Sequence, residues 1–182
     1  NMRRLFTIRD LCYISLFSTL IAVSGYISLP LPFSPVPVTA QTLAVMLSGS
    51  LLPVGHTFTS LIIFLMMGAI GLPIFSGGTS GLGAIAGKTG GYLIGFLAGA
   101  TLISLVKGKK PGFFRLLAIN ATGGILVVYT FGVLWLNYIT GIGIRKAIIF
   151  GALPFIPGDI VKILAAAVIT LRLNKHIRIE AE

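Results

Sequence analysis

Long apolar segments recur along this chain almost from one end to the other, and they constrain its fold more than any other feature. Of the 182 residues, 55% are hydrophobic and 10% are charged. A soluble domain of this length needs a charged surface, whereas the charges here are concentrated near the chain ends and in two short loops. The repeated apolar segments therefore predict an all-α integral membrane protein.

The hydropathy pattern predicts six transmembrane helices in a single membrane-embedded domain that covers residues 1–182. A spanning helix needs about 20 residues unless it is tilted or broken. The predicted helices are 10–29, 39–53, 56–75, 91–106, 114–139 and 147–171.

The positions of the basic residues explain the net charge of +10. They precede the first predicted helix, fill the loop at 107–115 and follow the last helix. This clustering is typical of the positive-inside rule, and it predicts that both termini are cytoplasmic. The basic residues thus fit a protein in a lipid bilayer, and no nucleic-acid partner is expected.

Two connections on the opposite side of the membrane have unusual compositions. The segment 28–39 carries four prolines and no charge, which favours an extended, stiff crossing. The segment 76–91 is rich in glycine. Irregular backbone near the membrane is stable only where protein buries it or where it lines a cavity. We therefore expect both segments to cap an outward-facing pocket.

A carboxylate and an ammonium group lie three residues apart in the last predicted helix. The chain has four acidic residues, and Asp159 is the one that lies far from the ends. Lys162 lies on the same helix face and precedes Arg172 by about 15 Å of helix, near the middle of a bilayer core roughly 30 Å thick. An intramembrane charge costs roughly 2.5–3.5 kcal/mol, which makes a polar ligand a candidate partner for the pair.

A purely structural role for this pair is the alternative. Asp159 is expected to cap a helix that restarts after Pro157 and Gly158, with Lys162 as its counter-ion. Capping accounts for the aspartate but not for a lysine at this depth, and broken helices near the midplane often present groups to transported solutes.

Further polar and aromatic residues lie beside the two loops. Gln41 offers both a donor and an acceptor to a cyclic urea or amide, although Thr39 before it is also a plausible helix cap. Tyr92 follows the glycine-rich loop, where it is either a ligand contact or, like Tyr26, an interfacial aromatic residue.

Small residues form stripes on two predicted helices. Glycines recur at every fourth position from Gly87 through Gly91 and Gly95 to Gly99, and this spacing favours close helix packing, mainly within one subunit. A weaker stripe on the first helix is a candidate surface for a partner protein. Its residues are Ser15, Thr19, Ser18 and Ala22.

Motifs for catalysis, nucleotides and metals are missing from the sequence. Gly87-Lys88-Thr89 lacks the preceding glycine and strand of a phosphate-binding loop, and no hydrolase motif is present. Cys12 is the sole cysteine, and His56 and His176 are far apart. The chain is therefore not expected to be an enzyme or to hold a cofactor.

Four separate runs resemble the BioY family, the biotin-binding S components of energy-coupling factor (ECF) transporters. They are PVPVTAQT at 35–42, GAIGLPIFSGG at 68–78, GKTGGYLIGF at 87–96 and FIPGDIVK at 155–162. The resemblance covers nearly the whole chain and implies a six-helix S component in a bacterial cell membrane. It also implies a transmembrane T component and two ATPase subunits as partners, with the first helix's small face as the T-component contact.

The same resemblance implies roles for the candidate residues. Asp159 and Lys162 would bind the ureido head of biotin, assisted by Thr79. Tyr92 and Lys88 would lie near the valerate carboxylate, although the family often has proline at position 88. The alternatives are an S component for a different vitamin, an intramembrane lipid-modifying enzyme and an assembly subunit without a ligand.

Overall fold

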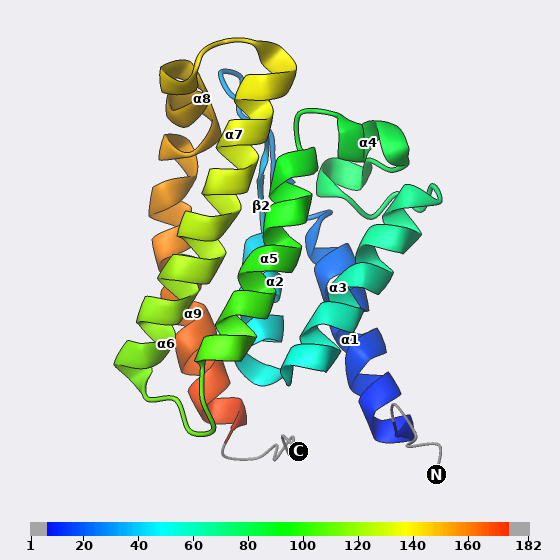
Figure 1. The fold of residues 1–182 in the computed structure, drawn as a ribbon, viewed down its shortest axis with the longest axis vertical. Helices are drawn as coiled ribbons and strands as arrows, with labels where there is room; N and C mark the ends of the chain where they lie inside the picture. The colour runs from blue at the N-terminus through cyan, green and yellow to red at the C-terminus, as the bar shows by residue number, and fades with distance from the viewer. Residues whose placement is uncertain (1–6, 175–182) are drawn as a thin grey trace.

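Helices dominate the computed structural model, which describes residues 7–174 (Figure 1). The basic residues Arg3, Arg4, Lys175 and Arg178 lie outside that range. The α-helices are α1 (Ile8–Ser24), α2 (Gln41–Leu51), α3 (Val54–Ala69), α4 (Leu82–Ala86), α5 (Gly90–Val106), α6 (Phe113–Asn120), α7 (Val128–Thr140), α8 (Ile144–Gly151) and α9 (Ile156–Leu173). A π-helical segment, Ala121–Val127, joins α6 to α7, and a 3₁₀ turn, Leu153–Phe155, joins α8 to α9.

Each of the six predicted ranges contains a helix, and the all-α prediction is confirmed. The joined segments Phe113–Thr140 and Ile144–Leu173 are long and apolar enough to cross a membrane, with a mean hydropathy of 1.8 in each. Helices α3 and α5 are shorter apolar helices. The third predicted helix ends earlier than expected, at Ala69, because Gly71 takes a φ of +110° and turns the chain out of the helix.

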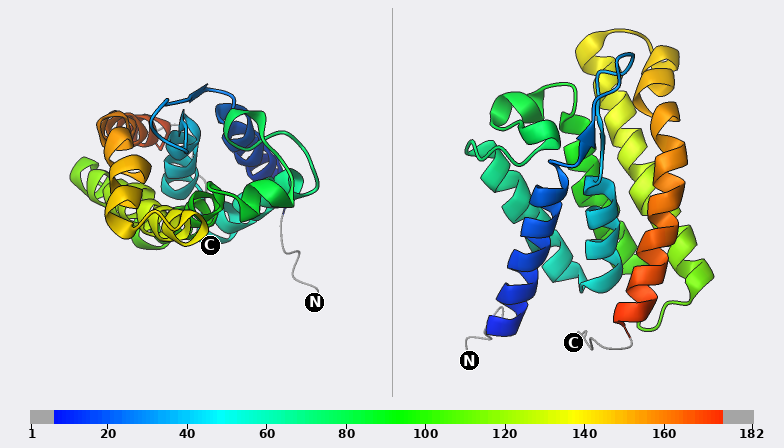
Figure 2. Two further views of the ribbon diagram at one scale, coloured as in Figure 1. Left: turned by 90° about the horizontal axis from the view of Figure 1, so that it is seen from above. Right: turned by 180° about the vertical axis from the view of Figure 1, so that it is seen from behind.

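The proline-rich segment is not helical, as predicted, but it turns back on itself as a small antiparallel ribbon instead of forming one extended crossing. Strands β1 (Ser28–Leu29) and β2 (Val38–Thr39) pair Ser28 with Thr39 and Leu29 with Val38. The ribbon and α4 lie at the end of the bundle opposite the start of α1 and the end of α9 (Figures 1 and 2). This arrangement places the two unusual connections together at one end of the molecule.

The break between α8 and α9 lies earlier than the sequence indicated. Helix α9 begins at Ile156 after the 3₁₀ turn, and Pro157 and Gly158 form part of its first turn. Proline is tolerated there because its missing N–H would have had no partner in the helix. Phe155 is the N-cap residue, and no side-chain capping bond forms, so the prediction that Asp159 caps this helix is wrong.

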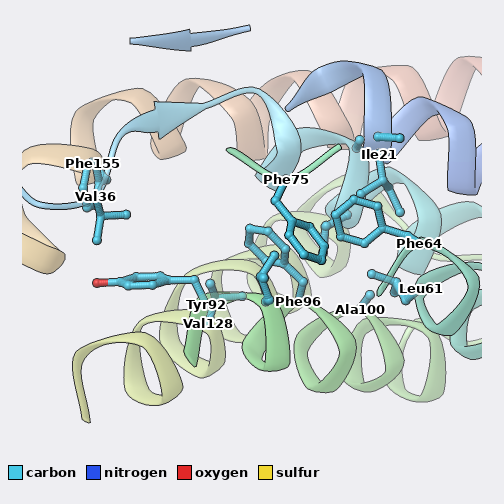
Figure 3. Close-up of a cluster of buried hydrophobic side chains, with 14 residues drawn as sticks. Ile21, Val36, Leu61, Phe64, Phe75, Tyr92, Phe96, Ala100, Val128 and Phe155 are labelled. Atoms are coloured by element: carbon cyan, nitrogen blue, oxygen red, sulfur yellow. The ribbon is translucent and has the colours of Figure 1, made fainter. Parts of the chain in front are cut away.

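A cluster of buried aromatic and aliphatic side chains connects α1, α3 and α5 with the loop that follows α3 (Figure 3). The rings of Phe64 and Phe75 meet edge to face, with centroids 5.4 Å apart. Gly68 makes this contact feasible, since a Cβ atom at that position would lie 2.1 Å from Cζ of Phe75. The cluster thus anchors the start of the glycine-rich loop on the helices below it.

The glycine face of α5 packs against α7 and the π-helical segment of the same chain, as expected. Gly91 lies against Trp135, Gly95 against Val128, and Gly99 against the backbone of Gly123. Gly87, the first member of the predicted stripe, precedes α5 and belongs to the loop. The close backbone approach of α5 to α7 and to the π-helical segment therefore fixes one wall of the bundle.

Candidate ligand-binding site

Asp159 and Lys162 form an ion pair on one face of α9. The Nζ atom of Lys162 lies 2.7 Å from Oδ1 of Asp159. The aspartate is 1% exposed, and the lysine side chain is 16% exposed. The predicted proximity of the two groups is confirmed, because residues three apart on a helix are neighbours on its surface.

Hydrogen bonds from other elements complete this pair. Lys162 donates to the carbonyl oxygen of Thr39 in β2 at 2.7 Å and to Oγ1 of Thr42 in α2 at 2.8 Å. The Thr42 hydroxyl donates in turn to Oδ1 of Asp159 at 3.2 Å, and the Tyr129 hydroxyl of α7 donates to Oδ2. Both charges are neutralised and hydrogen-bonded, as burial in an apolar segment requires.

The bonding capacity of the two groups differs. An ammonium group has three N–H donors, and all three of Lys162 have acceptors here. A carboxylate has about four acceptor positions, and Asp159 uses three of them. The remaining position is on Oδ2, so an incoming N–H group finds a free acceptor while an incoming carbonyl must displace an existing partner of the lysine.

A pocket of about 460 Å³, including its open mouth, surrounds the pair. The polar groups lie among apolar walls that include Phe96, Val128 and Phe155. Val36, Pro37, Val38, Thr39, Thr42, Ser76, Thr89, Tyr92, Leu93, Tyr129, Asp159 and Lys162 complete the lining. A mostly apolar pocket with a few convergent polar groups is typical of small-molecule sites.

Tyr92 lies in this pocket, where it is buried rather than interfacial. Its hydroxyl donates to the carbonyl oxygen of Gly151 at 2.6 Å, so its ring is a fixed wall element. Figure 3 shows the hydroxyl of Tyr92 on the side of Val36 and Phe155, pointing away from Phe64, Phe75 and Phe96.

Thr79 and Lys88 lie in a second, more open recess beside the pocket. This recess has about 860 Å³ of space, including open solvent, and shares Pro37, Ser76 and Thr89 with the pocket. Both side chains are exposed. Trp135 donates from Nε1 to the carbonyl oxygen of Gly87 at 2.9 Å and so fixes the loop just before Lys88.

Gln41 lines neither of these spaces. Its Nε2 donates to the carbonyl oxygens of Ile74 at 3.1 Å and Ile21 at 3.4 Å, and its Oε1 accepts from Ser76. The side chain is fully buried and ties α1 and α2 to the glycine-rich loop. The prediction that Thr39 caps this helix is wrong, because Ala40 is the N-cap residue of α2 and no side-chain capping bond forms.

The first-helix stripe divides between two faces. Ser15 and Thr19 are exposed, whereas Ser18 and Ala22 are buried inside the bundle. Ser18 donates to the carbonyl oxygen of Ser60 in α3 at 2.7 Å. Ser18 and Ala22 are therefore not part of a partner surface in this structure, because their helix face already packs within the chain.

The sequence analysis assigned no role in the site to Tyr129 or to Thr42. Tyr129 follows the π-helical segment, which changes the helix face on which the next residues lie. Hydropathy gives no signal for such a segment, since its residues are as apolar as those of a regular helix. Thr42 reaches the pair because it lies in the first turn of α2, directly after the ribbon.

The fold and the site together define a helical bundle with apolar helices long enough to cross a membrane and a mostly apolar pocket around a buried ion pair. A sequence model of the BioY family matches residues 2–179. The biotin transporter BioY of Thermotoga maritima is 40% identical over 167 residues, which cover 92% of this chain and 96% of the relative. The biotin transporter BioY of Rhizobium etli is 37% identical over 88% of this chain and 90% of its own length.

A solved structure agrees with these relatives. It is the S component for biotin from an ECF-type ABC transporter, and it superimposes with a TM-score of 0.89 at 31% sequence identity. The match covers 97% of this chain and 96% of the other. The chain belongs to the BioY family, with the S-component fold that its sequence predicts. Membership in a family of transporters also confirms that the chain is not an enzyme.

Proposed function

We propose that this chain is the biotin-binding S component of an ECF-type biotin uptake transporter. The observation that carries the proposal is the buried Asp159–Lys162 pair, which faces an apolar pocket with one acceptor position of the carboxylate still free. The relatives and the structural neighbour, which are named for biotin, support the choice of ligand.

The ureido head of biotin matches the bonding capacity of the pair. A urea has two N–H donors and one carbonyl acceptor. One N–H donates to the free position on Oδ2 of Asp159, and the carbonyl accepts from Lys162. Because all three lysine donors are already used, the ligand carbonyl replaces Thr42 as an acceptor, and the threonine keeps its bond to Asp159. Charge-assisted hydrogen bonds of this kind are the strong ones in binding sites.

The rest of the ligand fits the walls and the adjoining recess. The fused rings pack against Phe96, Val128 and Phe155, and Tyr92 contributes its ring. The aliphatic tail passes the shared rim at Ser76 and Thr89 into the recess of Lys88. In this arrangement Lys88 pairs with the tail carboxylate.

Two of the other candidate residues take different roles from those first expected. Thr79 lines the outer recess, where it lies nearer to the tail than to the ureido head. Gln41 stabilises the loop through its three protein partners rather than binding biotin.

The transport setting is part of the same proposal. The chain crosses a bacterial plasma membrane six times, with the start of α1 and the end of α9 on the cytoplasmic side. The distribution of the basic residues supports this orientation. A T component and two ATPase subunits supply the energy, and the T component contacts α1 through the exposed face that includes Ser15 and Thr19.

Equilibrium binding of labelled biotin to the detergent-purified chain tests the ligand assignment. The variants D159N and K162A should each weaken binding by roughly 10- to 100-fold, since each loses a charge-assisted hydrogen bond. K146Q, which removes an exposed charge outside the pocket, is the matched control and should bind as the wild type does.

Competition separates biotin from other vitamins. Dethiobiotin, which keeps the urea, should displace the label, whereas lipoic acid, which has a similar tail but no urea, should not. If biotin fails to bind while another vitamin does, the chain is an S component with a different substrate.

A further inference from the structure

Helices α5 and α9 terminate at the end of the bundle opposite the ribbon (Figures 1 and 2). A third recess is lined by residues that follow these two helices, together with residues at the α2–α3 turn. It has about 570 Å³ of space, including open solvent. Its lining residues are Ser50, Leu51, Pro53, Lys107, Gly108, Lys109, Pro111 and Asn174. None of them is acidic, and two are lysines, so the recess favours an anion.

Lys107 is the most constrained cation of this recess. Its Nζ donates to the carbonyl oxygen of Leu52, which also accepts from Ser104 at 2.7 Å and Thr57 at 3.2 Å. Burial lowers the pKa of this ammonium group to about 8. Since three donors already share one carbonyl, the charge of Lys107 is poorly compensated within the recess.

The carboxylates of the described residues 7–174 are engaged elsewhere. Asp10 pairs with His56 at 3.0 Å, and Asp159 pairs with Lys162. Compensation for Lys107 and its neighbours must therefore come from solvent, from a ligand or from the chain beyond Asn174.

Two more cations stand beside Lys107. Lys109 lines the recess and is exposed. Arg115 extends over Gly108 and donates from its guanidinium to the carbonyl oxygen of Val106 at 2.6 Å. Gly108 has a φ of +74°, a left-handed conformation that turns the chain between the two lysines. The loop lysines Lys107 and Lys109 are thus held close to Arg115 of α6, where an anion would relieve the repulsion among their charges.

Exposed apolar side chains border this basic loop in the chain. Leu105 and Val106 precede it, with 62% and 45% of their surface exposed, and Phe114 follows it with 82% exposed. The loop therefore lies at the boundary between apolar helix surface and polar surroundings. This is the level at which phospholipid headgroups lie, and basic pockets at helix ends are suited to anionic headgroups.

We propose that this recess binds the phosphate of an anionic phospholipid, with Lys107 and Lys109 as donors and the exposed apolar side chains in contact with its acyl chains. A lipid satisfies both features of the site, whereas a soluble phosphate or an acidic side chain satisfies only the charges. The site is separate from the biotin pocket and shares no lining residue with it.

Native mass spectrometry of the purified chain with phosphatidylglycerol or phosphatidylcholine tests whether the recess binds an anionic phospholipid. The wild type should retain phosphatidylglycerol at least about threefold more than phosphatidylcholine, and K107Q/K109Q should lose that preference. K109Q alone should reduce the preference for phosphatidylglycerol. Because it alters only an exposed side chain, it tests the site even if the double variant fails to fold. K146Q is the charge-matched control outside the recess and should behave as the wild type does. Biotin binding should be unchanged in all these variants.

Three results would overturn the proposal. The first is an equal loss of lipid retention in K146Q and K107Q/K109Q, which indicates a general charge effect. The second is thermal stabilisation of the wild type by inorganic phosphate as large as that by phosphatidylglycerol, which indicates a soluble anion. The third is lipid retention that is absent in the wild type but present in E180Q/E182Q, which indicates that the chain's own acidic terminus occupies the recess.

Discussion

The hydroxyl of Tyr129 donates a hydrogen bond to Oδ2 of Asp159, and it joins α7 to α9 in the lining of the pocket. The two residues are 30 positions apart in the sequence. The bond holds the carboxylate from the side opposite Lys162, whose ammonium group contacts Oδ1. Asp159 is thus positioned by two helices rather than by its own helix alone.

Replacing Tyr129 with phenylalanine should weaken biotin binding by roughly tenfold or more, since a hydrogen bond to a charged group is worth about 1.5–3 kcal/mol. The carboxylate keeps its bonds to Lys162 and Thr42 but loses its alignment with the ureido N–H. Isothermal titration in detergent measures the effect. Y138F, a change at an exposed tyrosine outside the pocket, is the control. Unchanged affinity in Y129F would show that the bond does not position the aspartate.

The Asp159–Lys162 pair should be strongly coupled in stability. Removing one member of a buried ion pair leaves an uncompensated charge at a cost of about 3–5 kcal/mol. We expect K162M to lower the melting temperature more than the double variant D159N/K162M, in which neither charge remains. A thermal-shift series on wild type, both single variants and the double variant gives the coupling. Additive losses would contradict it, and biotin binding should be impaired in all three variants.

Gly68→Ala should destabilise the loop that borders the pocket. The new Cβ would lie 2.1 Å from Phe75, and overpacking of a buried site costs about 1–3 kcal/mol. Gly55→Ala in the same helix is the matched control, because nothing lies within 4 Å of a Cβ at that position. The expected outcome is a lower melting temperature for G68A and an unchanged or slightly higher one for G55A. Equal melting temperatures would mean that Phe75 moves aside freely.

Two fully buried threonines should differ in how replacement by valine changes the melting temperature. The Thr57 hydroxyl has acceptors in the carbonyl oxygens of Ser48 and Leu52, at 3.2 Å each, whereas the Thr170 hydroxyl has no hydrogen-bond partner among residues 7–174. A buried polar group without a partner costs about 1–3 kcal/mol. T170V should therefore leave the melting temperature unchanged or raise it, and T57V should lower it. A marked loss of stability in T170V would reveal a partner, such as a bound water molecule.

Local features of the site were predictable because they depend on chain geometry over a few residues. Asp159 and Lys162 had to share a face once their segment was helical. The absence of helix in 28–39 followed from the restricted backbone of its prolines, whereas the reversal of the chain between β1 and β2 did not. The position of the break before α9 was misjudged, because proline and glycine near a helix start are compatible with both an interruption and a first turn.

Contacts across the bundle were not predictable in the same way. Gln41 and Tyr92 were both candidates for ligand contact in the sequence, yet Gln41 is held by backbone carbonyls outside the pocket and Tyr92 lines it. Ser18 and Thr19 are neighbours in the chain, but they face opposite environments. Such differences depend on which helix faces meet, and a pattern of apolar and small residues does not specify that uniquely.

The sequence by itself determined the helical membrane class, the approximate helix ranges and the charged pair, because apolar length and helical spacing are local physical constraints. Only the tertiary structure decided that Thr42 and Tyr129 complete the pair, that Lys88 lies in an adjoining recess and that Gln41 is a structural tie. The physical reason is that these roles arise from long-range packing. The glycine face of α5, the π-helical segment and the ribbon set how the helices are rotated and how far they are apart.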